Sequence, residues 1–476
     1  MAVKFGTSGL RGLSTELVGS VSALYATAFA RFLISEKLVL PGGPVVVGRD
    51  FRQSSPDIAA TVMAALKRAG LVPLDCGTIP TPALALYGQH IGAAGIMITG
   101  SHIPADRNGI KFYRPDGEID KQDESAITGF AASLESDESA NRVEAGTGEN
   151  RERAASELFL ARNFSILPPQ ALRGSRIGIY QHSTVARDMM VSVFEHYGAT
   201  VVPLGWSDTF IPVDTEAVSE ETEVLLRQWS SEYALDAIVS TDGDGDRPLV
   251  TDEEGRPLRG DLLGLVAARF LGATTVATPV TSNSGLEAVG GFEVVRTRVG
   301  SPFVIAAMND ALSSGKSGVI GFEANGGLML ASEFSIGGRT IAALPTRDSF
   351  LPALAILGNS AASGSSLSEI ARKYNLPVAL SDRIENFPVE RSAALMSYLR
   401  GSPKNLSAFL MPIGAVKSQN DIDGLRVTLA DDSVIHFRPS GNAPEMRCYV
   451  EAPTTAAAEA LIHKGLAAIR DWAPAG

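Results

Sequence analysis

The chain is poor in cysteine, which limits both its covalent and its metal chemistry. Among the 476 residues only Cys76 and Cys448 carry a thiol, and they lie far apart without a CxxC spacing. This pattern excludes a disulfide framework and indicates no thiolate zinc site. The sequence therefore predicts a protein of a reducing compartment.

Long hydrophobic runs are also missing. The N-terminus reads Met-Ala-Val-Lys-Phe-Gly-Thr, without a charged region followed by a long apolar stretch, and the apolar run at 262–271 is short and carries Arg269. Signal peptides and membrane-spanning helices have apolar segments that these stretches do not match. We therefore expect a cytoplasmic protein without a membrane partner.

An excess of positive charge is absent as well. Lys and Arg number 41 against 53 Asp and Glu, which gives a formal net charge of −12. An acidic chain is a poor partner for nucleic acid or for an anionic membrane. We expect no nucleic-acid partner, and any anionic ligand has to be held by a local group of cations.

The composition that is present belongs to a folded protein of several domains. Hydrophobic residues make up 45% and charged residues 20% of the chain, which excludes disordered and fibrous classes. At roughly 150 residues per domain the length favours about three domains, and two or four fit equally well.

Short apolar stretches alternate with helical stretches three times along the chain, as in parallel α/β units. The spacing of the three units is uneven, so the sequence predicts three related domains and no solenoid repeat. The expected strands are 44–48, 72–77, 95–100, 175–180, 200–205, 235–240, 274–280, 292–297 and 318–322, and the expected helices are 56–69, 81–89, 186–197, 220–232, a short one near 284, and 302–312.

The C-terminal part follows a different pattern. Apolar and polar residues alternate at 425–437 around Ala-Asp-Asp-Ser, as in a β-hairpin, and 455–472 is an Ala-rich amphipathic helix. This predicts a smaller α+β unit. The polar stretches near 135–153, 205–215 and 359–366 are predicted to be surface loops.

The most specific local motif is Asp242-Gly-Asp244-Gly-Asp246-Arg247, at the end of an apolar strand. The glycines let the backbone curl, so that three carboxylates can converge on one hard cation such as Mg²⁺. An EF-hand is rejected because Arg247 stands where that loop needs glycine. A polar turn of solvated aspartates is the alternative interpretation. Beside a cation, Arg247 would suit a phosphoryl oxygen bound to the same metal. We call 242–247 the metal loop.

A second motif, Thr99-Gly-Ser101-His102-Ile103-Pro, also follows an apolar strand. Ser101 lies where doubly wound sheets place reactive groups, beyond the carboxyl end of a strand. It is a candidate nucleophile, although the serine-hydrolase motif GxSxG lacks its second glycine here. A helix-capping serine is the alternative interpretation. His102 and Lys111 lie close by in the sequence and favour the functional one. We call 99–104 the serine loop.

Two further loops carry groups suited to a sugar phosphate. The sugar loop, Glu323-Ala-Asn325-Gly-Gly, offers a carboxylate and an amide for paired hydroxyls, with a tight turn as the alternative. The phosphate loop, Arg438-Pro-Ser440-Gly441-Asn442-Ala-Pro444, combines a guanidinium, a hydroxyl and a glycine-bent backbone that can cup an anion.

The order of these four loops resembles the α-D-phosphohexomutase superfamily, the phosphomannomutases and phosphoglucomutases. The resemblance spans nearly the whole chain and begins at Phe5-Gly-Thr-Ser-Gly-Leu-Arg11-Gly, which is similar to that family's N-terminal signature. It implies an α/β fold of three similar mixed α/β domains and a C-terminal α+β domain around a central cleft. We place these domains at 1–165, 166–258, 259–372 and 373–476.

The resemblance also implies a role for each candidate residue. Ser101 would be the phosphorylated serine and a metal ligand, and the three aspartates would bind Mg²⁺. Arg11 and Arg247 would offset developing charge, and Lys111 or His102 would be the acid or base. The implied substrate contacts are Glu323, Asn325, Arg438, Ser440, Gly441 and Asn442.

Three departures from the family pattern weaken any inference about the sugar. Ile103 stands where the family usually has asparagine, and the usual sugar loop E-x-S-G-H ends here in Asn-Gly-Gly. The usual Thr-Glu-Pro of the phosphate loop is replaced by Asn-Ala-Pro.

The implied activity is reversible phosphoryl transfer between O1 and O6 of a hexose phosphate, with mannose phosphate expected first. It would run through phosphoserine 101 and a hexose 1,6-bisphosphate, which would also be an activator, with Mg²⁺ as cofactor. Alternatives are a phosphoglucomutase, a phosphoglucosamine mutase, a Mg²⁺-dependent sugar phosphatase or a non-catalytic binder of sugar phosphates. The partners would be small hexose phosphates, and the protein a monomer or homodimer.

Overall fold

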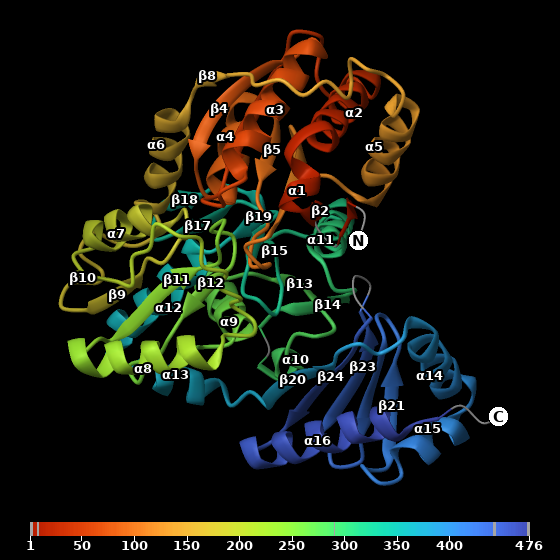
Figure 1. Cartoon of the computed structure of the whole chain (residues 1–476). Coiled ribbons are helices and arrows are strands. Elements are labelled where there is room, and N and C mark those ends of the chain that lie inside the picture. Colours follow the sequence, from red (N-terminus) through yellow and green to blue (C-terminus); the bar gives the residue numbers. More distant parts are fainter. Residues whose placement is uncertain (1–2, 7–8, 290, 441–443, 474–476) are drawn as a thin grey trace. The chain divides into compact units, whose positions relative to one another are not determined.

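The computed structural model describes residues 3–6, 9–289, 291–440 and 444–473 (Figure 1). By its internal contacts the chain divides into two compact units. The first consists of Met1–Ala277 and Gly300–Ala371, and the second of Thr278–Val299 and Arg372–Gly476. The chain thus leaves the first unit at 277, returns to it at 300, and leaves it again after 371.

The first unit begins with a mixed sheet. The central strands β5, β3 and β4 run parallel, and β6 and β2 continue the sheet antiparallel. The sheet order is β1 (Lys4–Phe5), β2 (Leu10–Leu13), β6 (Arg107–Arg114), β5 (Ala94–Ile98), β3 (Pro44–Arg49), β4 (Val72–Thr78) and β8 (Glu149–Asn150), with β7 (Gly117–Glu118) paired to β6.

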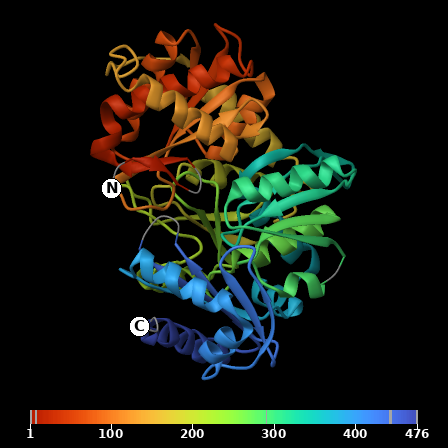
Figure 2. The same ribbon diagram turned by 90° about the vertical axis from the view of Figure 1, so that its right-hand side faces the viewer.

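Helices cover both faces of this sheet. Along β3, Val45 and Val47 belong to the core on one face, and Val46 points to the other face, against α4, because successive strand residues alternate in direction. The helices of the first face are α2 (Ser22–Ser35), α3 (Ser55–Arg68) and α5 (Lys121–Leu134), and those of the second are α4 (Thr81–Ile91) and α6 (Glu152–Asn163). Figure 2 shows this layered part in red and orange.

One helical stretch in the described part of the chain, Ser14–Ser35, has the length and composition of a membrane-spanning helix. It is broken at Val18 and Gly19, whose backbone angles are not helical, so that α1 (Ser14–Glu16) and the π-helical turn Leu17–Val21 precede α2. Phe29 and Phe32 on α2 are buried in the core. Core helices of globular domains meet the same length criterion, and the burial of α2 favours that interpretation.

Two further sheets complete the first unit. In one of them the parallel strands β10 (Thr200–Leu204), β9 (Arg176–Tyr180) and β11 (Ala237–Thr241) are joined by antiparallel β12 (Pro248–Val250), with helices α7 (Arg187–His196) and α8 (Glu220–Tyr233). In the other, β13 (Thr275–Pro279) runs parallel to β15 (Val319–Phe322), and β16 (Leu328–Leu330) and β19 (Leu344–Asp348) follow antiparallel. A separate hairpin is formed by β17 (Phe334–Ile336) and β18 (Arg339–Ile341). The helices of this part are α9 (Gly260–Leu271), α11 (Ser301–Ser313) and α12 (Phe350–Ser363).

The second unit is a layer of helices on an antiparallel sheet. The sheet order is β20 (Val378–Ile384), β24 (Met446–Ala452), β23 (Val434–Pro439), β22 (Leu425–Leu429) and β21 (Val416–Asn420). Its buried side chains form one core with α14 (Val389–Gly401), α15 (Pro403–Leu410) and α16 (Thr455–Asp471). The unit also contains α10 (Gly285–Val289), β14 (Glu293–Thr297) and part of α13 (Leu367–Tyr374).

These observations confirm the predicted fold class, and each strand and helix expected from the sequence has a counterpart. One loop prediction was wrong. Residues 359–363 are the end of α12, because Gly364, with φ +67°, ends that helix only after the small residues have continued it. The segment 205–215 is an irregular and mostly exposed loop, as predicted. The four domain boundaries and the central cleft stay predictions.

Two helical glycines test the packing of the first unit. A Cβ at Gly264 on α9 would lie 2.4 Å from Cγ of Phe322 on β15, whereas one at Gly129 on α5 would meet nothing within 4 Å. We expect Gly264→Ala to destabilise by about 1–3 kcal/mol through overpacking. Gly129→Ala should instead stabilise by about 0.5–1 kcal/mol. Thermal unfolding followed by circular dichroism measures both, and equal melting shifts for the two variants would contradict this packing.

Candidate active site

The candidate site forms where strands of three sheets in the first unit end. The serine loop follows β5, the metal loop follows β11 and the sugar loop follows β15. Carboxyl ends of parallel strands are the usual place for reactive side chains in α/β sheets. The three loops meet through side chains: Ser101 donates a hydrogen bond to Asp242, and Asp246 and Glu323 share one partner, Arg347.

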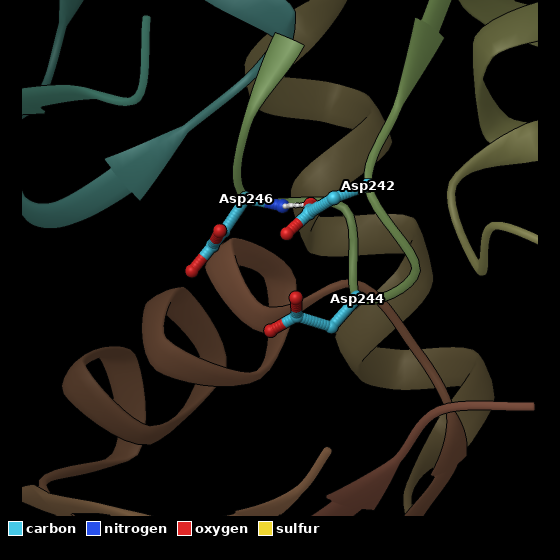
Figure 3. A group of neighbouring side chains, drawn as sticks. All are labelled: Asp242, Asp244 and Asp246. Atoms are coloured by element: carbon cyan, nitrogen blue, oxygen red, sulfur yellow. Dashed lines mark hydrogen bonds between the residues drawn. The ribbon is translucent and has the colours of Figure 1, made fainter. Parts of the chain in front are cut away.

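The three aspartates of the metal loop are fully buried and converge. Gly245, with φ +76°, gives the turn a conformation that other residues rarely adopt. Each aspartate offers one carboxylate oxygen to a common centre, and these oxygens lie within 4.8 Å of one another. Figure 3 shows the carboxylates of Asp242, Asp244 and Asp246 directed to the same side of the loop.

The hydrogen bonds of the aspartates leave room for a cation. Oδ2 of Asp244 accepts from Lys111 Nζ at 2.6 Å and from Thr81 Oγ1 at 2.5 Å, and Oδ2 of Asp246 accepts from Lys111 at 2.7 Å. Their Oδ1 atoms are buried and have no hydrogen-bond partner among the described residues. Unpaired buried carboxylate oxygens are costly, and oxygen donors are what Mg²⁺ prefers. The residues present therefore fit a divalent cation.

Electrostatics within the metal loop point in the same direction. Burial, together with Asp244 and Asp246, raises the pKa of Asp242 well above its usual range. Burial also opposes ionisation of Asp246, but Arg347, Lys111 and Arg247 outweigh it and lower the pKa of that carboxyl. The carboxylates repel one another, and a divalent cation among them would relieve that repulsion.

Ser101 lies against the metal loop. Its hydroxyl donates to Oδ2 of Asp242 and lies 3.2 Å from Nδ1 of His102. The residue is 1% exposed, and its φ of +55° is left-handed, which is uncommon for a non-glycine residue. Such a conformation costs of order 1–3 kcal/mol and persists only where neighbours fix it. We therefore expect side chains outside the serine loop to help fix its conformation.

Arg52, which the sequence analysis missed, supplies that hold. Its guanidinium donates to the backbone carbonyls of Ser101 at 3.0 Å, Ile103 at 2.6 Å, Pro104 at 2.6 Å and Arg107 at 2.8 Å. Nε pairs with Asp50 at 3.2 Å, and the side chain is fully buried. One cation thus fixes four carbonyls in and after the serine loop.

The segment 205–215, expected to be a surface loop, packs on this assembly. The ring of Phe210 lies 4.0 Å from the guanidinium carbon of Arg52, and a Cβ at Gly243 of the metal loop would come within 2.8 Å of that ring. Asp214 lies 4.0 Å from Nε2 of His102. This mostly exposed loop therefore brings two side chains, Phe210 and Asp214, up to residues of the site.

His102 is held neutral. Burial lowers its pKa, and Arg247 lowers it further. Nη1 of Arg247 lies 2.8 Å from Nδ1 of His102, and since a guanidinium can only donate, Nδ1 is the acceptor in this pair. His102 can therefore take up a proton only as a weak base.

Three arginines face the same space. Burial, with the charges of Arg247 and Arg347, lowers the pKa of Arg11 to about 10. Arg11 on β2 has no side-chain hydrogen bond to another described residue. Cations that crowd one another and retain free donors suit an anion such as a phosphoryl group.

The sugar loop is buried beside these cations. Glu323 and Asn325 are each 5% exposed. Oε2 of Glu323 accepts from Nη1 of Arg347 at 3.0 Å, and Oδ1 of Asn325 accepts from the amide of Gly327 at 3.0 Å. Arg347 on β19 was not singled out from the sequence, because no motif marks it.

The phosphate loop belongs to the second unit. Arg438, at the end of β23, donates from Nε to Oδ1 of Asp423 at 2.9 Å, and the amide of Ser440 donates to the carbonyl of Glu445 at 2.9 Å. Gly441 and Asn442 lie outside the described residues. That these four residues join the others in one site stays a prediction.

Comparison with known proteins shows the family to which the chain belongs. Family models for phosphoglucomutase/phosphomannomutase match three parts of the chain: α/β/α domain I at residues 2–138, α/β/α domain III at 259–376 and the C-terminal domain at 384–467. The chain belongs to the phosphoglucomutase/phosphomannomutase family.

Relatives of this family match over nearly the full length. A phosphomannomutase of Sinorhizobium fredii is 59% identical, with 98% of this chain and 99% of the relative covered. A phosphomannomutase of Salmonella muenchen is 43% identical, with 94% and 92% covered. A solved family protein of Burkholderia thailandensis has the same fold, with a TM-score of 0.76, 20% identity and coverage of 98% and 96%. The chain is therefore a phosphohexomutase, an isomerase that transfers a phosphoryl group between hexose phosphates.

Membership in the mutase family makes the hold on the serine loop testable. We expect Arg52→Lys to lower turnover of hexose phosphate about 100-fold, because a lysine cannot hold four carbonyls and a displaced nucleophile reacts slowly. Arg49→Lys is the matched control, since Arg49 ends β3, three residues before Arg52, and pairs at the partly exposed surface with Asp75. Steady-state kinetics measures both, and wild-type turnover in Arg52→Lys would refute the proposed hold.

Proposed function

We propose that the chain is a phosphomannomutase that interconverts mannose 1-phosphate and mannose 6-phosphate through phosphoserine 101. The observation that carries this proposal is the contact between the Ser101 hydroxyl and Asp242 of the metal loop. It puts a nucleophile beside a cluster that fits a divalent cation. The names of the two relatives, phosphomannomutases at 59% and 43% identity, favour mannose over other hexoses.

In the first half of the reaction the phosphoryl group moves from Ser101 to the free hydroxyl of the sugar. The bond between phosphorus and Oγ of Ser101 breaks, a bond to the sugar oxygen forms, and the hydroxyl loses its proton. The product is a hexose 1,6-bisphosphate. It reorients within the site, and its other phosphate is then transferred back to Ser101. Added hexose 1,6-bisphosphate would therefore act as an activator by phosphorylating Ser101.

Positioning and charge neutralisation carry most of such a transfer. Asp242, Asp244 and Asp246, with Ser101, would hold Mg²⁺, which supplies positive charge to the phosphoryl oxygens. Arg247 and Arg11 face the same space and would bind those oxygens as charge develops. Lys111 is committed to Asp244 and Asp246, which keep it protonated.

Two residues share the proton-transfer role in this proposal. His102 is neutral and close to the Ser101 hydroxyl, so it is the candidate base. Burial lowers the pKa of Lys111, but Asp244 and Asp246 raise it more strongly. Lys111 is therefore protonated and is the candidate acid. Phosphoryl transfer through a loose transition state requires little acid or base catalysis from these two residues.

The substrate contacts and the setting of the enzyme are also proposals. Glu323 and Asn325 would bind hydroxyls of the sugar, and Arg438, Ser440, Gly441 and Asn442 would bind the phosphate that is not transferred. Both cysteines are free and buried, which suits a reducing cytoplasm. A monomer or homodimer remains the expected state.

Phosphorus NMR tests the activity directly. With Mg²⁺ and a trace of hexose 1,6-bisphosphate, we expect mannose 1-phosphate to convert to the 6-phosphate faster than glucose or glucosamine 1-phosphate. Relative rates measured in separate tubes give the preferred sugar. Release of inorganic phosphate without isomerisation would instead identify a phosphatase, and no change in any tube would indicate a non-catalytic binder.

The nucleophile can be tested by Ser101→Ala. We expect this variant to lose turnover and to acquire no phosphate from hexose 1,6-bisphosphate, as read by intact mass, because the acceptor oxygen is gone. Ser54→Ala is a suitable control, since Ser54 contacts Asn108 and not the metal loop. Full activity in Ser101→Ala would disprove the assignment.

The metal loop can be tested without measuring turnover. Loss of a residue that only supports a metal ligand weakens metal binding by about 10- to 100-fold. We expect Asp244→Asn, which changes a ligand itself, to weaken Mn²⁺ binding by more than this in electron paramagnetic resonance. Asp310→Asn, at an exposed position of α11, should bind Mn²⁺ like the wild type. Equal binding in the two variants would place the cation elsewhere.

A further inference from the structure

Arg347 connects the sugar loop and the metal loop within the first unit. It lies near the end of β19 and is 2% exposed. Its Nε and Nη2 contact Oδ2 of Asp246 at 3.0 and 2.9 Å, and its Nη1 contacts Oε2 of Glu323 at 3.0 Å. A planar guanidinium presents its donors in a rigid fork, which fixes the relative orientation of two carboxylates more tightly than the rotatable ammonium of a lysine does.

The path of this side chain depends on Gly327. A Cβ at position 327 would lie 2.7 Å from Cδ and 2.8 Å from Cγ of Arg347. The arginine therefore runs through the space that a side chain at 327 would need. The usual family loop E-x-S-G-H has histidine at this position, where this chain has glycine. Here an arginine from a neighbouring strand occupies the space beside the sugar loop.

Both partners of Arg347 keep one oxygen free for another task. Asp246 directs its Oδ2 to Arg347 and Lys111. Its buried Oδ1 lies 3.8 Å from Nε of Arg247 and has no hydrogen-bond partner among the described residues. Glu323 uses Oε2 for Arg347, and no hydrogen bond of its Oε1 is observed in the described structure. One oxygen of each carboxylate is thus fixed, and the other is available to the cation or to the sugar.

We propose that Arg347 is a positioning residue that couples hexose recognition by Glu323 to the cation site at Asp246. This inference rests on the proposed function for the identity of the sugar. Because one guanidinium orients both carboxylates, displacement at one side changes the other, and binding free energies coupled in this way are reciprocal. Cation and hexose phosphate should each strengthen the binding of the other.

Two substitutions test the coupling without removing the charge. Arg347→Lys keeps the charge but removes the rigid fork of donors that contacts both carboxylates. Gly327→Ala keeps the arginine but displaces its side chain, because the new Cβ would lie 2.7 Å from its Cδ. For both we expect about 10- to 100-fold weaker Mn²⁺ binding in electron paramagnetic resonance, the range for loss of a partner of a metal ligand. The KM for mannose 1-phosphate should rise, and calorimetry in EDTA should show weaker binding of mannose 1-phosphate to the metal-free variants.

A matched control separates positioning from general destabilisation. Arg162→Lys also removes a largely buried guanidinium, one that donates to the carbonyl of Ala342 near the start of β19 and does not contact the site. We expect its melting temperature to fall as far as that of Arg347→Lys or further, while Mn²⁺ affinity and KM stay at wild-type values. Equal losses of affinity in both variants would overturn the inference.

The double variant Glu323→Gln with Arg347→Lys decides whether Arg347 acts through Glu323. If it does, the fold-changes in mannose 1-phosphate binding are not multiplicative, because either substitution alone already breaks the pair. Multiplicative losses would overturn the inference, as would wild-type Mn²⁺ affinity in Arg347→Lys. If the wild type does not interconvert the mannose phosphates, the proposed function fails, yet the Mn²⁺ measurements still test the link between the two loops.

Discussion

The site depends on the burial of negative charge at the ends of strands. Asp242, Asp244 and Asp246 have no exposed surface, and Glu323 is nearly as buried. Lone carboxylates at such positions would be neutralised or would destabilise the fold. Lys111 and Arg347 offset them from β6 and β19, strands of two different sheets. The metal loop can therefore hold its shape only when the serine-bearing and sugar-bearing parts of the unit are packed against it.

The same constraint explains why Ser101 needs support from outside its loop. The serine loop is held locally by the bond from the Ser101 amide to Thr99 Oγ1 at 2.8 Å, but its carbonyls need partners from elsewhere. Arg52 satisfies the loop carbonyls, Asp50 pairs with Arg52, and Phe210 covers the guanidinium. Each of these residues is distant from Ser101 in the sequence. The geometry of Ser101 therefore depends on packing between segments that are distant in the sequence.

Sequence reasoning succeeded where the determining interactions are local. Apolar periodicity gave the α/β units and the C-terminal α+β layer, and the spacing of Asp242, Asp244 and Asp246 gave the converging carboxylates. It missed Arg52 and Arg347, because the sequence does not distinguish a buried arginine from an exposed one. Their partners are distant in the sequence, and Asp246 for example lies 101 residues from Arg347. The segment 205–215 is a surface loop as predicted, but nothing in its sequence indicates that Phe210 covers Arg52.

The exchange of a loop side chain for Arg347 has a consequence for recognition. A histidine in the sugar loop could contact the substrate without contacting the metal loop, and it could move together with the sugar loop. Arg347 is instead fixed at both ends, to Glu323 and to Asp246, and it can reach them only because Gly327 leaves the space open. Flexibility of the sugar loop is then limited by the metal loop. Discrimination between hexoses in this chain should therefore depend on the geometry of Glu323 as set by Arg347, and less on adaptable side chains within the loop.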